Sequence, residues 1–318
     1  MRAGYDSHML ATLSLPAPRS RGWRAAWLAC AALAFMPALL LSPPLQAQTG
    51  TDSAQETPSL MIELGSHSAP VRRIDVQRGI AVTASDDRTA RVWDVASGEL
   101  RHVLRPLAQG NEVGRLYGAA IHPSEPLVAV AGTSGSADTQ HLIYLFDLDS
   151  GALKRTINAQ AGDIRKLAWS ADGSVLLAGY NGTHGVRAFA LDGRPLLDDR
   201  FPGPVFGLAV GAGGVAAAVG LDGTLRSYRV GAGAAAVSGQ TVISGRRPAA
   251  VSFNPDGSRL AVAYATPREG PEFFDTATLR SSGRLAAENL FGGDWRVLAW
   301  SADGRSQIGR RRVGKECA

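Results

Sequence analysis

Short apolar segments alternate with turn residues along most of the chain, between residues 59 and 304. Segments such as "IAVTAS", "LVAVAG" and "VLLAGY" are rich in small and β-branched side chains and are too short for helices. They are bounded by pairs such as Asp172-Gly173 and Asp256-Gly257, which supply the positive φ that tight hairpin connections need. Residues 60–300 carry no helical period of convincing length. The pattern predicts an all-β fold built from antiparallel hairpins.

The hairpins recur at a regular interval. Apolar segments that run into a turn align on six anchor residues, which are Val76, Ile121, Trp169, Val210, Phe253 and Trp300. Successive anchors are 45, 48, 41, 43 and 47 residues apart, and a period of about 40 to 45 residues is typical of propeller arrays. Each period holds a first strand, a small-residue strand, a strand with aromatic residues and a fourth strand after a turn. We therefore predict a β-propeller of four-stranded antiparallel blades, incomplete in this sequence, with five blades plus part of a sixth.

One repeat, "ASDDRTARVWDVASGEL" at residues 84–100, contains a Trp-Asp pair. Residues 66–106 resemble a WD-repeat blade closely, and a looser resemblance covers residues 59–304. The resemblance implies a WD-repeat β-propeller with a structural tetrad of hydrogen-bonded side chains, His67, Thr83, Asp87 and Trp93. Such a set is stable because imidazole, hydroxyl and indole groups satisfy a buried carboxylate. The other repeats depart from the motif and have, at this place, Phe146-Asp147, Phe189, Tyr228 and Phe274-Asp275.

The N-terminal region has the features of an export signal. Three arginines, Arg19, Arg21 and Arg24, precede an apolar run at residues 25–41, and the small residue Ala47 follows at a plausible cleavage point. We expect a signal peptide over residues 1–47, a linker over residues 48–58, and a periplasmic or secreted bacterial location. A membrane anchor is the alternative, although the apolar run is short and Pro37 interrupts it.

The export signal and several blade segments together resemble one group of bacterial proteins. Segments such as "APVRRIDV", "LYGAAIHPSEPLVAVAG" and "IYLFDLDSGALKR" are similar to the WD-repeat portion of exported caspase-family (metacaspase-like) proteins. The resemblance implies that a Cys-His peptidase domain accompanies the propeller. The chain has only Cys30, inside the expected signal, and Cys317, near its end, so we expect no catalytic dyad, no disulfide and no thiolate metal site here.

The C-terminal residues break the repeat. The heptamer "LAWSADG" is followed by the apolar "SVLLAGY" at residue 174, but its second copy, ending at residue 304, is followed by "RSQIGRRRVGKECA". We interpret residues 59–304 as a partial ring and residues 305–318 as an aberrant basic tail, similar at "RRVGKEC" to a translated sequencing adapter. The chain then represents a C-terminally truncated fragment, and a genuine basic tail is the alternative.

Charge argues against nucleic acid as a partner. Residues 1–47 and 310–318 hold eight of the 33 basic and two of the 28 acidic residues, which leaves the body with 25 basic and 26 acidic residues. A nucleic-acid-binding body would carry the basic excess itself. No cofactor is expected either, since the Rossmann-like "GAGGVA" at residues 211–216 falls in a predicted hairpin, not before a helix. We also expect no membrane span once the signal is removed and no metal site, and we leave the oligomeric state open.

The leading functional interpretation is an interaction or scaffold module for a protein or peptide partner. In WD-repeat propellers, residues near the start of each inner strand reach the rim of the channel. Counting four residues back from each anchor gives a candidate partner-binding rim of Arg72, Tyr117, Arg165, Phe206, Ala249 and Arg296. Arginine and aromatic residues are enriched in binding hot spots, whereas ordinary solvated rim residues are the alternative. A propeller enzyme with a channel site and a structural subunit of an envelope complex remain as alternatives, but His67, Asp87 and Ser85 are expected inside a blade and not in a catalytic site.

Overall fold

The structure is a computed structural model, and it describes residues 65–106, 114–134, 141–160, 162–243, 245–265, 270–285, 295–301, 303–304 and 307–311. The chain divides into two compact units, Met1–Leu60 and Met61–Ala318, and all described residues belong to the second. The expected signal peptide (residues 1–47) and linker (residues 48–58) lie outside the described residues, so both stay predictions. The described ranges contain no helix that is long and apolar enough to cross a membrane.

The described residues form 22 strands, arranged in sheets of consecutive antiparallel strands. The first blade comprises β1 (Val71–Gln77), β2 (Ile80–Ser85), β3 (Ala90–Asp94) and β4 (Leu100–Leu104). The second comprises β5 (Leu116–Ile121), β6 (Leu127–Gly132), β7 (Leu142–Asp147) and β8 (Leu153–Asn158). The third comprises β9 (Ile164–Trp169), β10 (Val175–Tyr180), β11 (Val186–Ala190) and β12 (Pro195–Asp199). The fourth comprises β13 (Val205–Gly211), β14 (Val215–Gly220), β15 (Thr224–Gly231) and β16 (Ala234–Val242). The fifth comprises β17 (Pro248–Phe253), β18 (Arg259–Tyr264), β19 (Glu272–Asp275) and β20 (Ser281–Arg284), and a two-stranded sheet follows with β21 (Trp295–Trp300) and β22 (Gln307–Arg311).

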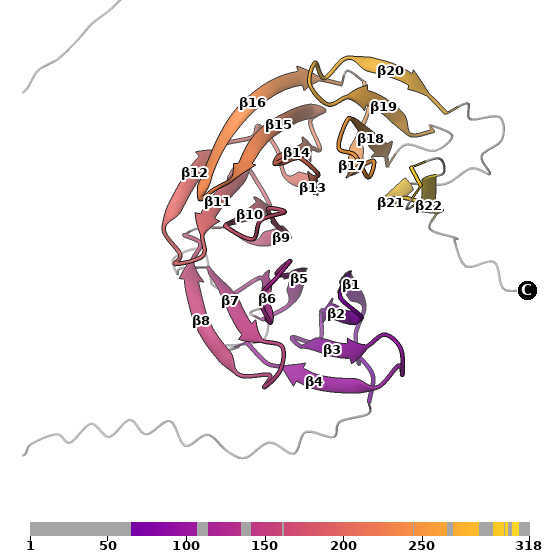
Figure 1. The fold of residues 1–318 in the computed structure, drawn as a ribbon. Helices are drawn as coiled ribbons and strands as arrows, with labels where there is room; N and C mark the ends of the chain where they lie inside the picture. Colours follow the sequence, from indigo (N-terminus) through magenta and orange to yellow (C-terminus); the bar gives the residue numbers. More distant parts are fainter. Residues whose placement is uncertain are drawn as a thin grey trace, which may run out of the picture. The chain divides into compact units, whose positions relative to one another are not determined.

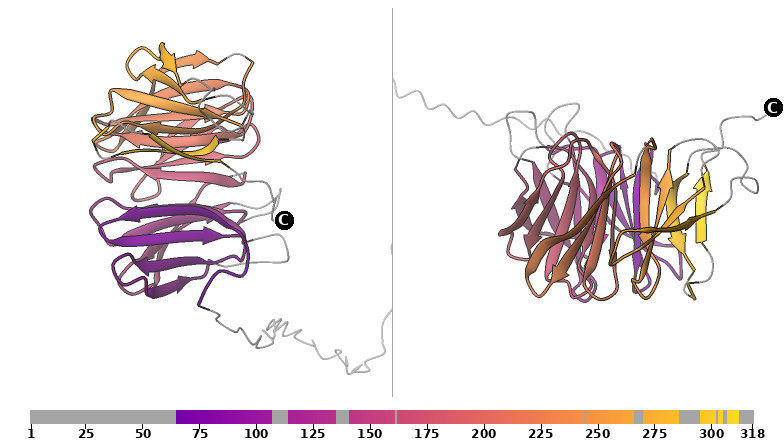
Figure 2. Two further views of the ribbon diagram at one scale, coloured as in Figure 1. Left: turned by 90° about the vertical axis from the view of Figure 1, so that its right-hand side faces the viewer. Right: turned by 90° about the horizontal axis from the view of Figure 1, so that it is seen from above.

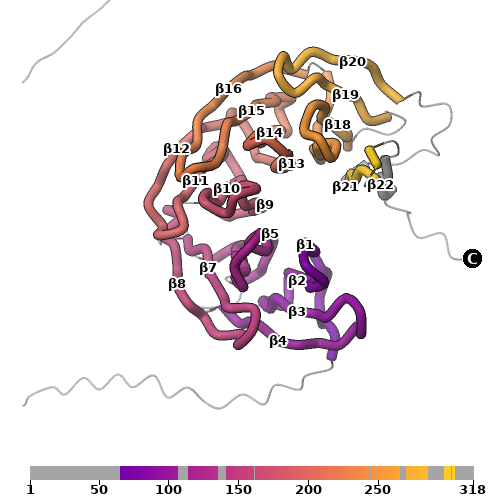
Figure 3. Tube along the Cα trace, in the orientation of Figure 1, coloured from indigo at the N-terminus to yellow at the C-terminus, as the bar shows by residue number. Residues whose placement is uncertain are grey.

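The blades follow one another in an arc in chain order (Figure 1). The first strand of each blade lies on the inside of the arc and the fourth lies on the outside, so the chain returns inward to begin each new blade (Figure 3). Neighbouring inner strands contact one another in the order β1, β5, β9, β13, β17 and β21. The strands of neighbouring blades run alongside one another, and their ends form two faces of the arc (Figure 2). The all-β prediction of five four-stranded blades and part of a sixth is confirmed.

The hydrophobic core lies between the blades rather than within one layer. All six residues of β6 are buried, and the four central ones alternate between two clusters. Val128 and Val130 pack toward the first blade, whereas Ala129 and Ala131 pack toward the third. Because successive side chains of a strand point to opposite faces, a blade held between two neighbours must be apolar at every position of its middle strands. This explains why the second strand of each repeat reads as a continuous small apolar run.

Part of the segment after residue 304 adds a strand to the sixth sheet. The sequence offered no apolar second strand after β21, yet the structure pairs β22 with β21, from Trp295 opposite Arg311 to Trp300 opposite Gln307. Strand pairing uses backbone N–H and C=O groups, so a polar, basic segment can join a sheet without an apolar pattern. The sheet is also joined to the fifth blade, because the Trp300 indole Nε1 donates to the Ser252 carbonyl at 3.2 Å. Trp169 Nε1 makes the corresponding bond to the Ala120 carbonyl at 3.1 Å.

Candidate functional site: a channel lined by the inner strands

Every inner strand carries an irregularity near its start. In β1 the pairing with β2 passes from Val71 to Arg73, so Arg72 is skipped. The skipped residues of the six inner strands are Arg72, Tyr117, Arg165, Phe206, Ala249 and Arg296. These are the six residues of the candidate rim. A bulge of this kind inserts one unpaired residue and turns its side chain away from the normal alternation. Two successive residues of one inner strand can therefore face the same space.

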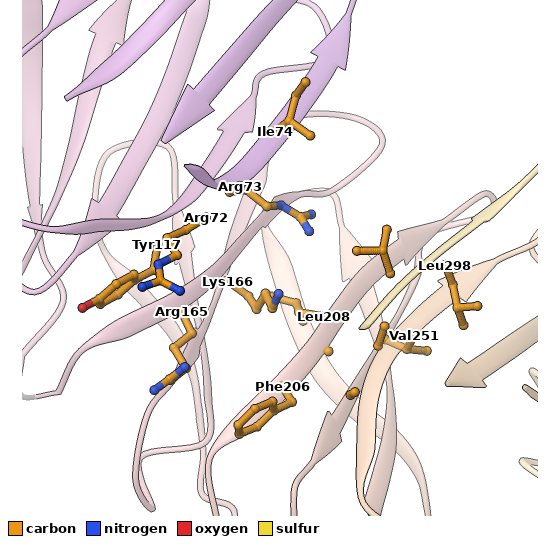
Figure 4. A pocket seen from close by; sticks show the side chains of 14 residues that line it. Arg72, Arg73, Ile74, Tyr117, Arg165, Lys166, Phe206, Leu208, Val251 and Leu298 are labelled. Carbon is orange, nitrogen blue, oxygen red and sulfur yellow. The ribbon is translucent and has the colours of Figure 1, made fainter. Parts of the chain in front are cut away.

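The bulged residues meet in one cavity of about 520 Å³. Its lining includes Arg72 on β1, Tyr117 on β5, Arg165 on β9, Phe206 on β13 and Ala249 on β17. Figure 4 shows the first four of these side chains around the cavity. The side chain of Arg296, the sixth candidate, lies outside the described residues. The fold thus brings five predicted rim residues together from five separate blades.

The two described rim arginines are held differently. The guanidinium Nε of Arg72 donates to both carboxylate oxygens of Asp86, at 2.9 and 2.8 Å, and its Nη2 makes a further ion pair with the same carboxylate. These hydrogen bonds raise the pKa of Arg72. Arg165 instead lies over the ring of Phe206, with its guanidinium carbon 5.5 Å from the ring centroid. Arg72 is therefore neutralised in place, whereas the charge of Arg165 faces an aromatic ring.

Two further basic residues line the same cavity, and the sequence analysis missed them. Arg73 and Lys166 directly follow the bulged Arg72 and Arg165, and their side chains extend into the space between β1 and the strands that carry Leu208 and Val251 (Figure 4). Burial, and to a smaller extent the nearby charges of Arg73 and Arg165, lower the pKa of Lys166 to about 8. The signal that could have revealed them is the basic doublet, "RR" and "RK", at the same phase of two repeats.

A second cavity, of about 480 Å³, continues from the first. The two share Arg73, Leu208, Val251 and Leu298 as lining residues. Beyond Arg73 the second cavity passes Asp75, whose carboxylate accepts the Ile121 backbone N–H at 2.7 Å. The channel therefore runs along the inner strands, with basic residues toward the end where the bulges lie.

The predicted tetrad is assembled in the first blade. His67 Nδ1 lies 2.8 Å from Asp87 Oδ2, and His67 Nε2 lies 2.7 Å from the Thr83 hydroxyl. The Trp93 indole Nε1 donates to the same hydroxyl oxygen at 2.9 Å. Asp87 also accepts the backbone N–H and hydroxyl of Thr89 at 2.9 and 2.7 Å. Burial alone would raise the pKa of Asp87, but the hydrogen bonds from Thr89 and His67 outweigh it and lower the pKa.

This arrangement does not support a hydrolase. Both ring nitrogens of His67 are engaged by Asp87 and Thr83. The Ser85 hydroxyl donates instead to the Ala69 carbonyl at 3.1 Å, away from the imidazole. In a Ser-His-Asp arrangement the imidazole must lie within hydrogen-bond reach of the serine hydroxyl to act as its base. Within the described ranges, no group of three or more His, Cys, Asp or Glu side chains could hold a metal ion. The "GAGGVA" segment forms the turn between β13 and β14 and not the start of a helix, with Gly213 and Gly214 at φ of 74° and 71°.

The blades without the tetrad contain other buried polar groups. Phe146, Phe189, Tyr228 and Phe274 take the register position of Trp93 and are buried. In the fourth blade the Tyr228 hydroxyl donates to Asp199 at 2.8 Å. In the fifth, the Tyr264 hydroxyl donates to Glu272 at 2.8 Å. The Tyr228 hydroxyl of the fourth blade thus uses a carboxylate on β12 of the third blade, whereas the Tyr264 hydroxyl uses a carboxylate of its own blade.

Comparison with known proteins agrees with this architecture. The model of the WD domain, G-beta repeat, matches residues 59–94 and 151–184. F-box/WD repeat-containing protein 4 of Mus musculus is 32% identical over 94 residues, which cover 29% of this chain and 21% of that protein, and the Homo sapiens protein matches equally well. WD repeat-containing protein pop1 of Schizosaccharomyces pombe is 38% identical over 72 residues, or 23% of this chain and 9% of that protein. The chain thus spans about a fifth or less of the length of these relatives. The matched segments and the blade architecture are similar to those of WD40 repeat domains, which are usually non-catalytic and commonly bind proteins.

Proposed function

We propose that this chain is a protein-interaction module that binds a segment of a protein partner at the bulged rim of its channel. The observation that supports this most is the convergence of Arg72, Tyr117, Arg165 and Phe206 on one cavity. The four residues come from four blades, and each reaches the cavity from an equivalent bulge in its own inner strand. A surface of arginine and aromatic side chains around a concave centre has the composition of a binding hot spot.

Site-specific photo-crosslinking tests this proposal. The 318-residue chain is produced in its native host with a photo-reactive phenylalanine at Tyr117, and the cross-linked protein is identified by mass spectrometry. The matched control carries the same group at Val237, an exposed residue on the outer strand β16. We expect one partner from position 117 and none from position 237. In a second variant, Arg72, Arg165 and Arg296 are also replaced by Ala. We expect this variant to melt at the same temperature but to lose the cross-link from position 117. Recovery of the same amount of cross-linked partner would overturn the proposal.

The same proposal includes export of the module. Its support is the sequence pattern of residues 1–47, in which arginines precede an apolar run and small residues follow. A fusion of residues 1–58 to alkaline phosphatase, which is active only outside the cytoplasm, should be active in Escherichia coli. Deletion of residues 25–41 from the fusion should remove that activity. An inactive full fusion, made at normal levels, would overturn the proposed location.

The module is also proposed as the binding or regulatory part of a caspase-family peptidase. Its support is the resemblance of segments such as "LYGAAIHPSEPLVAVAG" to the propeller portion of those exported proteins. The test is the gene sequence that follows the codon of residue 304. A downstream segment with a His and a Cys in a peptidase-like pattern would support this role. A stop codon soon after one further blade would overturn it in favour of a free-standing scaffold.

A further inference from the structure

The inner part of the channel contains more positive charge than the protein neutralises. Arg73, Arg165 and Lys166 all line the cavity. The Nε atoms of Arg73 and Arg165 are buried and have no hydrogen-bond partner among the described residues. Lys166 likewise forms no ion pair within the part of the chain that the structure describes. Arg72 does not belong to this group, because Asp86 already pairs with it.

Such a cluster is costly for the protein alone. Removing a cation from water without giving it a partner is unfavourable, and like charges placed together add to that cost. The structure shows the consequence, since burial lowers the pKa of both Arg73 and Lys166. Asp75 attracts Arg73, but the Asp75 carboxylate already accepts the Ile121 backbone N–H. A bound anion would relieve the repulsion and use the unpaired donors.

The opposite wall of the cavity is apolar. It is formed by Leu208 on β13, Val251 on β17 and Leu298 on β21 (Figure 4). These residues also line the second cavity, so the channel continues beyond the basic cluster. A small inorganic anion would use the cations and leave this wall in contact with water. A peptide that carries a carboxylate beside an apolar side chain would use both walls.

We propose that the channel binds an acidic peptide segment, with an Asp or Glu carboxylate held by Arg73 and Lys166 and a neighbouring apolar side chain held against Leu208, Val251 and Leu298. This inference rests on the proposed function and specifies the chemistry of the partner. Arg165 closes the basic cluster at the rim, where Phe206 supports its side chain. The rim bulges admit the segment, and the cations inside the rim determine which segment stays bound.

Fluorescence anisotropy with defined peptides tests the proposal on the full 318-residue chain. The probe is a fluorescein-labelled peptide of sequence Ser-Gly-Leu-Glu-Leu-Gly-Ser, with matched peptides in which Gln replaces Glu or Ala replaces both Leu. We expect the Glu peptide to bind at least tenfold more tightly than either matched peptide. Arg73→Gln and Lys166→Gln should each remove the preference for Glu over Gln. Arg72→Gln should keep it, because Arg72 is paired with Asp86.

The controls separate the possible failures. Melting curves show whether each variant is folded, and loss of an unpaired cation should leave stability unchanged or higher. Equal binding of the Glu and Gln peptides would overturn the acidic-peptide inference. Full displacement of the Glu peptide by an equimolar concentration of inorganic phosphate would also overturn it, in favour of a small-anion site. If the double variant Arg73→Gln, Lys166→Gln still captures the cross-linked partner at Tyr117, the proposed function stands and this inference fails.

Discussion

The indole Nε1 of Trp93 lies 2.9 Å from the hydroxyl oxygen of Thr83, and the same oxygen lies 2.7 Å from His67 Nε2. One hydroxyl therefore connects the third strand of the first blade to the loop before its first strand. The chain of contacts continues from His67 to the Asp87 carboxylate in the hairpin between β2 and β3. The tetrad ties the segment before β1 and the hairpin between β2 and β3 to the paired strands β2 and β3. Each member leaves a partner unsatisfied if it is removed.

We expect Trp93→Ala to destabilise the protein by about 3 to 5 kcal/mol, because it leaves a cavity and removes a donor from Thr83. Trp93→Phe keeps most of the volume and loses only the indole N–H, so it should cost about 1 kcal/mol. Asp87→Ala should also destabilise, since His67 and Thr89 lose their acceptor. Urea unfolding of the three variants measures these differences. Wild-type stability in Trp93→Ala and Asp87→Ala would contradict a stabilising tetrad.

The repeat period and the hairpin turns were sufficient to predict the blades, because strand alternation and positive-φ glycines are local properties of the sequence. The pairing of β22 could not be predicted in the same way. Its residues, "QIGRR", carry no apolar alternation, and the strand forms through backbone pairing with β21. The polar network around Glu272 was also missed, since its members are 8 to 26 residues apart and come together only when the blade folds.

The candidate rim was predicted only from the position of each residue within its repeat. That position says where a residue lies in the blade but not which side chains surround it. The alignment placed Arg72 and Arg165 as equivalents, but a carboxylate pairs with one and an aromatic ring supports the other. Arg73 and Lys166 were missed because regular strand alternation would point them away from the residues before them. The bulge at Arg72 and at Arg165 breaks that alternation. A bulge arises from pairing with the second strand and is not encoded by the inner strand alone.

Glu272 in the fifth blade should make stability depend on pH. Its carboxylate accepts hydrogen bonds from Tyr264 at 2.8 Å, Ser281 at 2.6 Å and Arg246 at 2.7 Å. Burial alone would raise its pKa, but these contacts and Arg284 lower it below the usual 4.5. A depressed carboxyl pKa stabilises the folded state above pH 4.5 and loses that contribution as the pH falls through the lower, folded value.

Replacement of this carboxyl group by an amide tests the effect. We expect Glu272→Gln to cost about 1 to 3 kcal/mol at pH 7. The stability of this variant should fall less with acid than that of the wild type, so that the difference between the two shrinks as the pH falls below 4.5. The control is Glu99→Gln, an exposed side chain in a turn of the first blade. Chemical unfolding at a series of pH values provides the data. A constant difference between wild type and Glu272→Gln from pH 7 to pH 3 would contradict the assigned pKa direction.

Gly207, directly after the bulged Phe206, is required for close approach of two blades. A Cβ at this position would lie 2.6 Å from Val219 Cγ2 and 2.8 Å from the backbone nitrogen of Val251. The second atom belongs to the backbone of the neighbouring inner strand β17 and cannot move away alone. We therefore expect Gly207→Ala to destabilise by about 1 to 3 kcal/mol, as overpacking does. Gly203→Ala is the matched control, because its Cβ would have nothing closer than 3.8 Å. Equal melting temperatures of Gly207→Ala and Gly203→Ala would contradict the prediction, because they would show that β13 and β17 can move apart without loss of stability.

Lys166 should also make stability rise with pH, as Glu272 does, but in the alkaline range. Its pKa is about 8 in the folded protein, against 10.5 for an ordinary lysine, chiefly because of burial and then because of Arg73 and Arg165. Between these two values the unfolded chain holds more protons than the folded protein, so the free energy of unfolding rises with pH. From pH 8 to pH 10 the rise from this one group should be about 2 to 3 kcal/mol. Lys166→Met should lack it, whereas Lys154→Met, which removes an exposed lysine on β8, should keep it. Urea unfolding up to pH 10 measures the slope. Tyrosine ionisation begins in this range, but it affects the wild type and Lys166→Met equally and cancels in their difference. A parallel pH profile for the wild type and Lys166→Met would mean that Lys166 keeps its proton in the channel and that the basic cluster is better solvated than its burial indicates.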